Sequence, residues 1–278
     1  MRVVSTKSDV RRLRKEAAGA WGLVPTMGYL HAGHVSLVER ARAENDQVAV
    51  SIFVNPIQFG PTEDLAAYPR DLERDLRLLE EAGADLVWAP PAEEVYPLGF
   101  QTYVTVEDVS RPLEGAARPG HFKGVATIVA KLFNVFQPDR AYFGQKDAQQ
   151  AAVIRRMARD LDFPLEVVVC PTLREPDGLA MSSRNVYLTP EQRSAAPVLF
   201  RALCAAREDW QSGERNGDIL KAKIRQVLDA EPLARTEYVS AADPLTLDEI
   251  RDESQSVLLS MAVRIGRARL IDNVLLEA

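Results

Sequence analysis

The chain of 278 residues contains 46% hydrophobic residues, so it can bury a sizeable core and form one large domain or two unequal ones. Its formal charge of -6 provides no global basic field for tRNA or DNA, which argues against a nucleic-acid partner while leaving room for a local cationic pocket. The N-terminus lacks the apolar run of a signal peptide and no segment approaches the roughly 18 apolar residues of a membrane span, so we expect a cytoplasmic protein without a membrane partner.

Strand-like and helix-like segments alternate through the first 170 residues. The expected order is strand 22–26, a helix beginning near His34, strand 47–55, a helix ended by Gly83, strand 84–89, helix 122–136, strand 140–144, helix 147–161 and strand 165–170. Strands separated by helices predict an α/β fold with a Rossmann-like, doubly wound parallel sheet. Ligands of such sheets bind beyond the carboxyl ends of the strands.

The pattern changes after about residue 172. Residues 190–210 and 217–228 are predicted to be helices, and strands are expected near Tyr238 and over 257–276, with a hairpin turn at Gly266-Arg267. These elements predict a smaller α+β C-terminal domain over 173–278, next to a Rossmann-like domain over 1–172. A single merged domain is the alternative.

The two cysteines, Cys170 and Cys204, are far apart in sequence and form no C-x-x-C motif. They suggest neither a disulfide framework nor a zinc cluster. We expect two buried thiols in a reducing compartment.

Two of the three histidines, His31 and His34, lie in a glycine-flanked segment after the first of these strands. A helix that begins there aims unpaired N–H groups and a partial positive charge at a ligand, Gly28 and Gly33 allow close approach, and the imidazoles add donors. The segment predicts a phosphate site, and the alternative is that the histidines are incidental turn residues. A P-loop is disfavoured because His34-Val35 stands where that motif needs Lys-Ser or Lys-Thr.

Several segments, taken in order, resemble one family. Met27–His34 resembles the H-x-G-H signature of the nucleotidylyl transferase superfamily, and the further segments resemble the pantothenate synthetase family within it. They are 53–59, 68–70, 120–125, 143–147, 149–150 and 178–185. The match covers about residues 22 to 190, and the ordered set is far more specific than any one motif.

The resemblance implies an ATP-dependent ligase that condenses (R)-pantoate with β-alanine through a pantoyl-adenylate and releases AMP and pyrophosphate. It implies catalytic roles for His34, His31 and Lys146, with His34 as the acid. It assigns pantoate to Gln58, Gln150, Asn55 and His121, and β-alanine to Gln58. It assigns ATP to Met27, Gly28, Tyr29, Leu30, His31, Ala32, Gly33, His34, Gly144, Gln145, Lys146, Asp147, Leu173, Met181, Ser182, Ser183 and Arg184.

The residue types suit these roles. Lys146 offers phosphate a compact positive charge, and the uncharged amides Asn55, Gln58 and Gln150 suit the hydroxyls and carboxylate of a small acid. The alternatives are a solvated surface pair at Lys146-Asp147 and an ordinary turn at 182–185. We expect the turns at 27–34, 144–147 and 181–184 to converge in space around a single triphosphate, with a pocket for a hydroxy acid alongside.

The resemblance also implies Mg²⁺ that enters with ATP, and a homodimer. It implies that the domain over 1–172 binds the nucleotide and pantoate and that the C-terminal domain over 173–278 acts as a lid. This sequence departs from the family pattern at two positions. Many family members have an acidic residue before Asp75, where this chain has Arg74, and a Glu where it has Gln145. The first leaves the protein ligands of Mg²⁺ unassigned, with Asp75 as an open candidate.

Three competing functions share part of these motifs. A class I aminoacyl-tRNA synthetase needs a tRNA-binding surface that this acidic chain does not offer. An adenylyltransferase that keeps the nucleotide on its product fits Gln58, Gln150 and the segment 181–185 less well. A non-catalytic ATP-binding sensor would bind ATP without exchanging pyrophosphate.

Overall fold

The computed structural model describes residues 1–61, 63, 65–252 and 254–277. The chain forms two compact units. The first comprises residues 1–144 and 153–171, and the second comprises residues 145–152 and 172–278.

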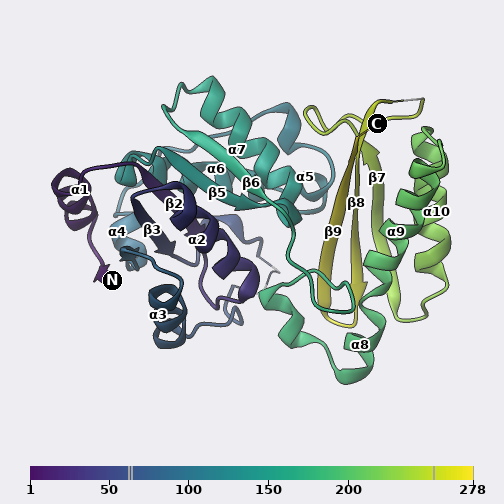
Figure 1. Cartoon of the computed structure of the whole chain (residues 1–278), viewed down its shortest axis with the longest axis horizontal. Helices are drawn as coiled ribbons and strands as arrows, with labels where there is room; N and C mark the ends of the chain where they lie inside the picture. Colours follow the sequence, from purple (N-terminus) through teal and green to yellow (C-terminus); the bar gives the residue numbers. More distant parts are fainter. Residues whose placement is uncertain (62, 64, 253, 278) are drawn as a thin grey trace. The chain divides into compact units, whose positions relative to one another are not determined.

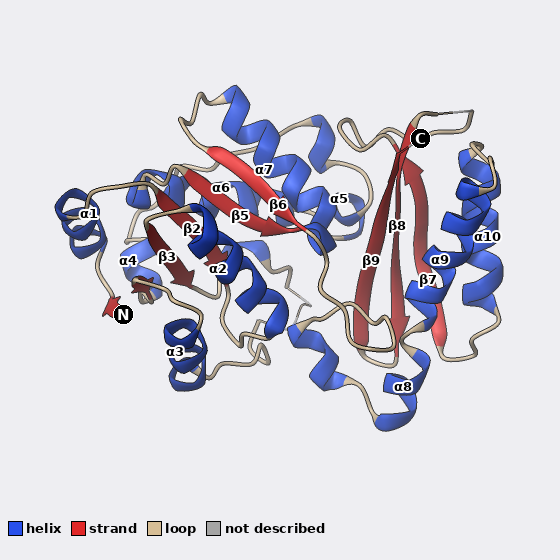
Figure 2. Cartoon of the chain, in the orientation of Figure 1, coloured by secondary structure: helices blue, strands red, loops and turns tan. Residues whose placement is uncertain are grey.

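The first unit contains a six-stranded parallel sheet, shown in red in Figure 2. Its order is β1 (Arg2–Val4), β4 (Leu86–Trp88), β3 (Gln47–Ile52), β2 (Trp21–Thr26), β5 (Arg140–Gly144) and β6 (Glu166–Cys170). The strand order reverses between β2 and β5, and such a switch point is where doubly wound sheets bind ligands. The predicted Rossmann-like sheet is therefore confirmed.

Helices cover both faces of this sheet. On one face, α2 (Ala32–Glu44) and α3 (Leu72–Glu81) share a core with Val50 and Val87 of the strands. On the other face, Trp88 of β4 packs edge-on against Phe136 of α6 (His121–Phe136), with ring centroids 5.9 Å apart, and α1 (Lys7–Glu16) contacts α6. The remaining helices that begin within residues 1–171 are η1 (Pro56–Gln58), α4 (Ala92–Val95), η2 (Asp108–Ser110), α5 (Glu114–Ala117), η3 (Gln145–Asp147) and α7 (Ala148–Asp160).

The second unit is built on a three-stranded antiparallel sheet in the order β7 (Ala234–Ala242), β8 (Ser256–Ile265) and β9 (Ala268–Glu277). In Figure 1, α9 (Val198–Gln211) and α10 (Gly217–Asp229) lie along this sheet. Leu203 of α9, Ile224 of α10 and Met261 of β8 are almost fully buried in their shared core. The short helices η4 (Ser183–Tyr187) and α8 (Pro190–Ala195) precede α9.

Three predictions about these elements need correction. The expected helix 190–210 is divided into α8 and α9, because Pro197 has no N–H to continue the helical ladder. The strand expected over 47–55 ends at Ile52, whereas the helix expected near His34 is confirmed and begins at Ala32. Cys204 is partly exposed, whereas Cys170 is buried as expected.

The predicted hairpin at Gly266-Arg267 is confirmed, since β8 and β9 pair directly on either side of it. Gly266 has a φ of +59°, a left-handed conformation that favours glycine. No helix in the described part of the chain has both the length and the apolar character needed to cross a membrane.

Candidate active site

The histidine turn, residues 27–34, connects β2 to α2. His31 is the N-cap of α2, and its Nδ1 accepts a hydrogen bond from the Gly33 N–H at 3.1 Å. The Nδ1 of His34 accepts from the His31 N–H at 3.4 Å, which completes a capping box built from two imidazoles. The two rings lie 4.1 Å apart, centroid to centroid.

This geometry corrects the expectation of unpaired amides at the start of the helix. The N–H groups of His31 and Gly33 bond to the rings, and the His34 N–H bonds to the His31 carbonyl at 2.8 Å. Because each Nδ1 acts as an acceptor, the proton of each neutral ring resides on Nε2. The imidazole Nε2–H is therefore the hydrogen-bond donor of each side chain.

Asp75 of α3 anchors the histidine turn from behind. Its side chain is 1% exposed, and its two carboxylate oxygens accept from the N–H groups of Tyr29 and Leu30, each at 2.7 Å. Tyr29 has a φ of +51°, which is uncommon for a residue with a side chain, so the turn needs such an anchor. Burial raises the pKa of Asp75, although the two N–H groups and nearby Arg74 oppose the rise.

Arg74 holds the same turn by its carbonyl side. Its Nη1 donates to the Leu30 carbonyl at 2.8 Å, and its guanidinium lies 5.5 Å from the centroid of the Tyr29 ring. Asp75 thus binds the N–H of Leu30, and Arg74 binds its carbonyl. Asp75 uses both oxygens on the turn and is an anchor in this structure.

Two buried amides converge beside the histidine turn. The Asn55 Nδ2 donates to the Gln58 Oε1 at 2.9 Å and to the Gly124 carbonyl at 3.1 Å, and the Gln58 Nε2 lies 3.2 Å from the Met27 Sδ. Gly124 permits this approach of α6, because a Cβ there would lie 2.5 Å from the Ile57 carbonyl oxygen. The structure therefore brings three predicted site residues together: Met27, Asn55 and Gln58.

Tyr96 completes this amide cluster. Its hydroxyl donates to the Asn55 Oδ1 at 2.7 Å, and burial raises its pKa, so it stays protonated near neutral pH. Asn55 is consequently held at both ends of its amide.

His121 holds the backbone of Gln58. Its Nδ1 lies 2.9 Å from the Gln58 carbonyl oxygen and its Nε2 lies 3.0 Å from the Arg118 Nη1. Since a guanidinium only donates, Nε2 accepts and the proton sits on Nδ1. Burial and the charge of Arg118 lower the pKa of His121 to about 4, and Arg118 is itself paired with Glu63 at 2.8 and 2.6 Å. Neutral His121 is thus placed to position Gln58.

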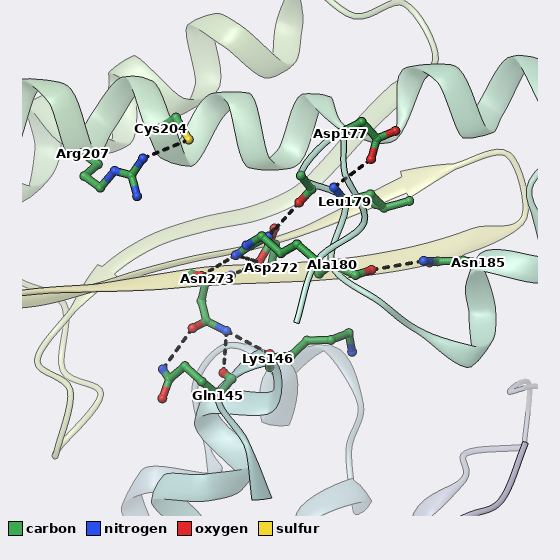
Figure 3. A network of polar contacts seen from close by, with 12 residues as sticks. Gln145, Lys146, Asp177, Leu179, Ala180, Asn185, Cys204, Arg207, Asp272 and Asn273 are labelled. Atoms are coloured by element: carbon green, nitrogen blue, oxygen red, sulfur yellow. Dashed lines mark hydrogen bonds and ion pairs between the residues drawn. The ribbon is translucent and has the colours of Figure 1, made fainter. Parts of the chain in front are cut away.

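The lysine turn, residues 145–147, belongs to the second unit and forms η3. The Nζ of Lys146 lies 3.6 Å from the Asp147 carboxylate. Asn273 of β9 donates to the carbonyls of Gln145 and Lys146, each at 2.9 Å (Figure 3). The Lys146 side chain extends away from Asn273 in that view.

The remaining predicted residues lie in the second unit, apart from Gly144, which ends β5. Leu173 is 39% exposed, and its carbonyl accepts from the Met181 N–H at 3.1 Å. Ser182 caps η4, where its hydroxyl accepts from the Arg184 N–H at 3.2 Å, and Ser183 is buried. Gln150 lies in the first turn of α7. The substrate roles of all these residues stay predictions.

Sequence reasoning missed several residues that hold the predicted ones in place. They are Tyr96, Arg118, Arg174, Asp272 and Asn273, together with the anchoring role of Asp75. Two signals were present in the sequence. Asp75 lies four residues before Leu79, on the apolar stripe of its helix, and Asp272-Asn273 interrupts an apolar strand.

Comparison with known proteins shows the family to which the chain belongs. A family model described as pantoate-beta-alanine ligase matches residues 2–275. A pantothenate synthetase of Roseiflexus sp. (strain RS-1) is 63% identical over 278 residues, which covers 100% of both chains.

Two solved structures are also similar. Pantothenate synthetase from Thermus thermophilus superposes with a TM-score of 0.94 at 55% identity and covers 99% of each chain. Pantoate-beta-alanine ligase from Francisella tularensis, complexed with beta-gamma ATP and beta-alanine, gives a TM-score of 0.80 at 33% identity and covers 99% of this chain and 97% of that one. The chain described here therefore belongs to the pantoate-beta-alanine ligase family.

Proposed function

We propose that the protein condenses (R)-pantoate with β-alanine to form (R)-pantothenate, using ATP and releasing AMP and pyrophosphate. The observation that carries the proposal is the amide cluster against the histidine turn, where Gln58 reaches Met27 at 3.2 Å. A cluster of neutral amides for a small acid then adjoins imidazole donors for phosphate. Membership of the ligase family supports the same reaction.

In the first half-reaction, a carboxylate oxygen of pantoate attacks the α-phosphorus of ATP and the bond to pyrophosphate breaks. Negative charge grows on the phosphate oxygens, so fixed donors that point at them lower the barrier. The Nε2–H groups of His31 and His34 supply two such donors, and Lys146 supplies a compact positive charge. Ser182, Ser183 and Arg184 act on the same nucleotide as a closing loop, in keeping with the proposed lid role of residues 173–278.

Pantoate is held by Asn55, Gln58 and Gln150. Neutral amides bond to its hydroxyls and carboxylate without adding a charge that would compete with the phosphates. His121 acts by fixing the Gln58 backbone through its Nδ1–H.

In the second half-reaction, the amine of β-alanine attacks the acyl carbon of the pantoyl-adenylate and AMP leaves. The mixed anhydride is already activated, so no protein nucleophile is needed. The protein contributes position and the exclusion of water, with Gln58 holding β-alanine.

We further propose that Mg²⁺ enters with ATP and is bound mainly by phosphate oxygens and water, as is usual for this ion. Across the residues that the structure describes, no group of three or more His, Cys, Asp or Glu side chains could hold a metal ion. Asp75 already bonds two N–H groups and has Arg74 beside it, so this position fits a turn anchor better than a metal ligand. The bound ion would neutralise phosphate charge.

A cytoplasmic homodimer without membrane or nucleic-acid partners is also proposed, from the family resemblance and the acidic composition. Analytical ultracentrifugation tests the oligomeric state directly. A monomer at micromolar concentration would contradict this part of the proposal.

The test of the reaction is exchange of labelled pyrophosphate into ATP. We expect exchange with pantoate and little with other small acids or amino acids, and His34→Ala should reduce it by at least about a hundredfold without unfolding the protein. Exchange that depends on an amino acid would favour a synthetase-like activity. ATP binding without any exchange would favour a sensor.

A further inference from the structure

Two adjacent residues of β9, Asp272 and Asn273, are buried and polar, at 2% and 4% exposure. Side chains of successive strand residues point to opposite faces, so Asp272 and Asn273 lie on opposite faces of the three-stranded sheet. Asp272 lies opposite Met261 in the β8 register, and Asn273 lies opposite Ser260. Figure 3 shows that both side chains form hydrogen bonds or ion pairs with neighbouring residues.

The Asn273 amide fixes the lysine turn. Both protons of its Nδ2 go to consecutive carbonyls, those of Gln145 and Lys146, at 2.9 Å each, and its Oδ1 accepts from the Gln145 Nε2 at 3.1 Å. Two donors on consecutive carbonyls set the orientation of the peptides from which the Lys146 side chain departs. Neither an aspartate nor an aliphatic residue could supply them.

The Asp272 carboxylate fixes the loop that leads to Met181–Arg184. It binds the Arg174 guanidinium through two parallel bonds of 2.6 and 2.9 Å. Arg174 also donates to the Gly178 carbonyl at 3.1 Å and stacks 4.2 Å from the Phe200 ring centroid. A bidentate Arg–carboxylate pair fixes the orientation of the two groups as well as their distance. Asp272 therefore orients, from β9, the loop that leads to Met181–Arg184.

We infer that Asp272 and Asn273 are positioning residues for the reaction, since from one strand they align the lysine turn and the loop before Met181–Arg184. The inference rests on the proposed function of those segments in binding ATP. Neither residue needs to touch a substrate. Asn273 acts through Lys146, and Asp272 acts through Arg174.

The inference also accounts for Gln145, where many family members carry Glu. The Gln145 Nε2–H meets the Asn273 Oδ1, while the Asn273 amide protons are committed to the two carbonyls. A carboxylate at position 145 would face the Oδ1 without a proton between them. Gln145 is thus matched to Asn273 in this chain.

The test is a double-mutant cycle between Asn273 and Lys146, measured by pantoate-dependent pyrophosphate exchange. We expect Asn273→Ala to lower the rate by at least about tenfold, and Lys146→Ala by about a hundredfold. In the Lys146→Ala background, Asn273→Ala should change the rate less than about twofold, because residues that act as a unit are not additive. A purely structural role would instead multiply the two losses.

Ser260→Ala is the matched control. Ser260 is buried opposite Asn273, and its hydroxyl has no hydrogen-bond partner among the described residues, so the rate should stay within about twofold of the wild type. Should thermal unfolding show that Asn273→Ala does not fold, Asn273→Ser replaces it in the cycle, because one hydroxyl can hold only one of the two carbonyls.

Each result bears on a defined claim. If the wild type exchanges normally and the two losses multiply, or Asn273→Ala shows no loss, the inference is overturned but the proposed function is not. A wild-type protein without pantoate-dependent exchange would overturn the proposed function and, with it, this inference.

Discussion

The histidine turn and the lysine turn carry side chains with the same predicted task, yet the protein anchors them with opposite chemistry. In the histidine turn, the buried Asp75 carboxylate accepts from two consecutive N–H groups. In the lysine turn, the buried Asn273 amide donates to two consecutive carbonyls. The comparison shows that a turn can be fixed through either half of the peptide bond.

The difference has consequences for charge. A buried carboxylate holds strong, charge-assisted bonds but carries a desolvation cost, which appears as the raised pKa of Asp75. A neutral amide adds no negative charge beside Lys146. We therefore expect the stability of the residues around the histidine turn to change with pH and with the removal of charge. The lysine turn should instead respond to the loss of the Asn273 hydrogen bonds.

The largest expected effect comes from removing the anion behind the histidine turn. Asp75→Ala leaves the N–H groups of Tyr29 and Leu30 without acceptors, each at a cost of about 1–3 kcal/mol, and the exchange rate should fall at least about a hundredfold. Asp75→Asn keeps one acceptor and should lose about half as much stability. Urea unfolding and pyrophosphate exchange measure both.

Glu73→Ala is the control for Asp75, because it lies on the same helix with its side chain 88% exposed in an ion pair with Arg77. Its effect on the free energy of unfolding should stay below about 0.5 kcal/mol. Equal effects of Asp75→Ala and Glu73→Ala would show that the buried carboxylate is no anchor.

A pH titration of stability sharpens the contrast. His121 has a pKa lowered to about 4 by burial and by Arg118, with Glu63 and Glu114 opposing the change. Below about pH 6.5, His121 is therefore protonated in the unfolded chain but stays neutral in the folded protein. The free energy of unfolding consequently falls as the pH drops from about 6.5 towards about 4.

Between about pH 7 and about pH 4.5, this linkage should cost on the order of 2 to 3 kcal/mol. His121→Asn should remove that part of the pH dependence, since its amide can donate to the Gln58 carbonyl without titrating. Parallel slopes for the wild type and the variant in urea unfolding at several pH values would contradict the assigned state of His121.

The smallest expected effect concerns the lysine turn. Gln145→Glu removes one side-chain donor and leaves both Asn273 bonds to the carbonyls, so it should cost about 0.5–1.5 kcal/mol of stability and reduce exchange only severalfold. Gln145→Ala, which adds no charge, should do less. A Gln145→Glu variant as stable as the wild type would break the proposed match with Asn273.

The sequence predicts the elements that carry local patterns. The β-branched run at 47–55 and the apolar helix 122–136 signal their structure directly, and β3 and α6 form there. The glycine-flanked histidines likewise signal a turn between a strand and a helix.

The anchors of the two turns were not predictable in the same way. Asp75 meets Leu30 across 45 residues and Asn273 meets Gln145 across 128 residues, and no local spacing encodes such partners. The roles of the rings were also hidden, because whether a histidine caps a helix by its Nδ1 depends on the backbone conformation of the turn. A polar residue on an apolar stripe, as at Asp75, marks a buried role without naming the partner.

The central claim is that His34 completes the capping box of α2 through Nδ1 and acts on phosphate through Nε2–H. Two substitutions separate these atoms: in His34→Asn the Oδ1 lies near the place of Nδ1, and in His34→Gln the terminal N–H approximates the Nε2 donor. The decisive measurement is pantoate-dependent pyrophosphate exchange by both variants, alongside their urea unfolding. The account predicts that His34→Gln exchanges at least about tenfold faster than His34→Asn, while both variants stay folded. Exchange by His34→Asn that equals or exceeds that of His34→Gln would contradict it.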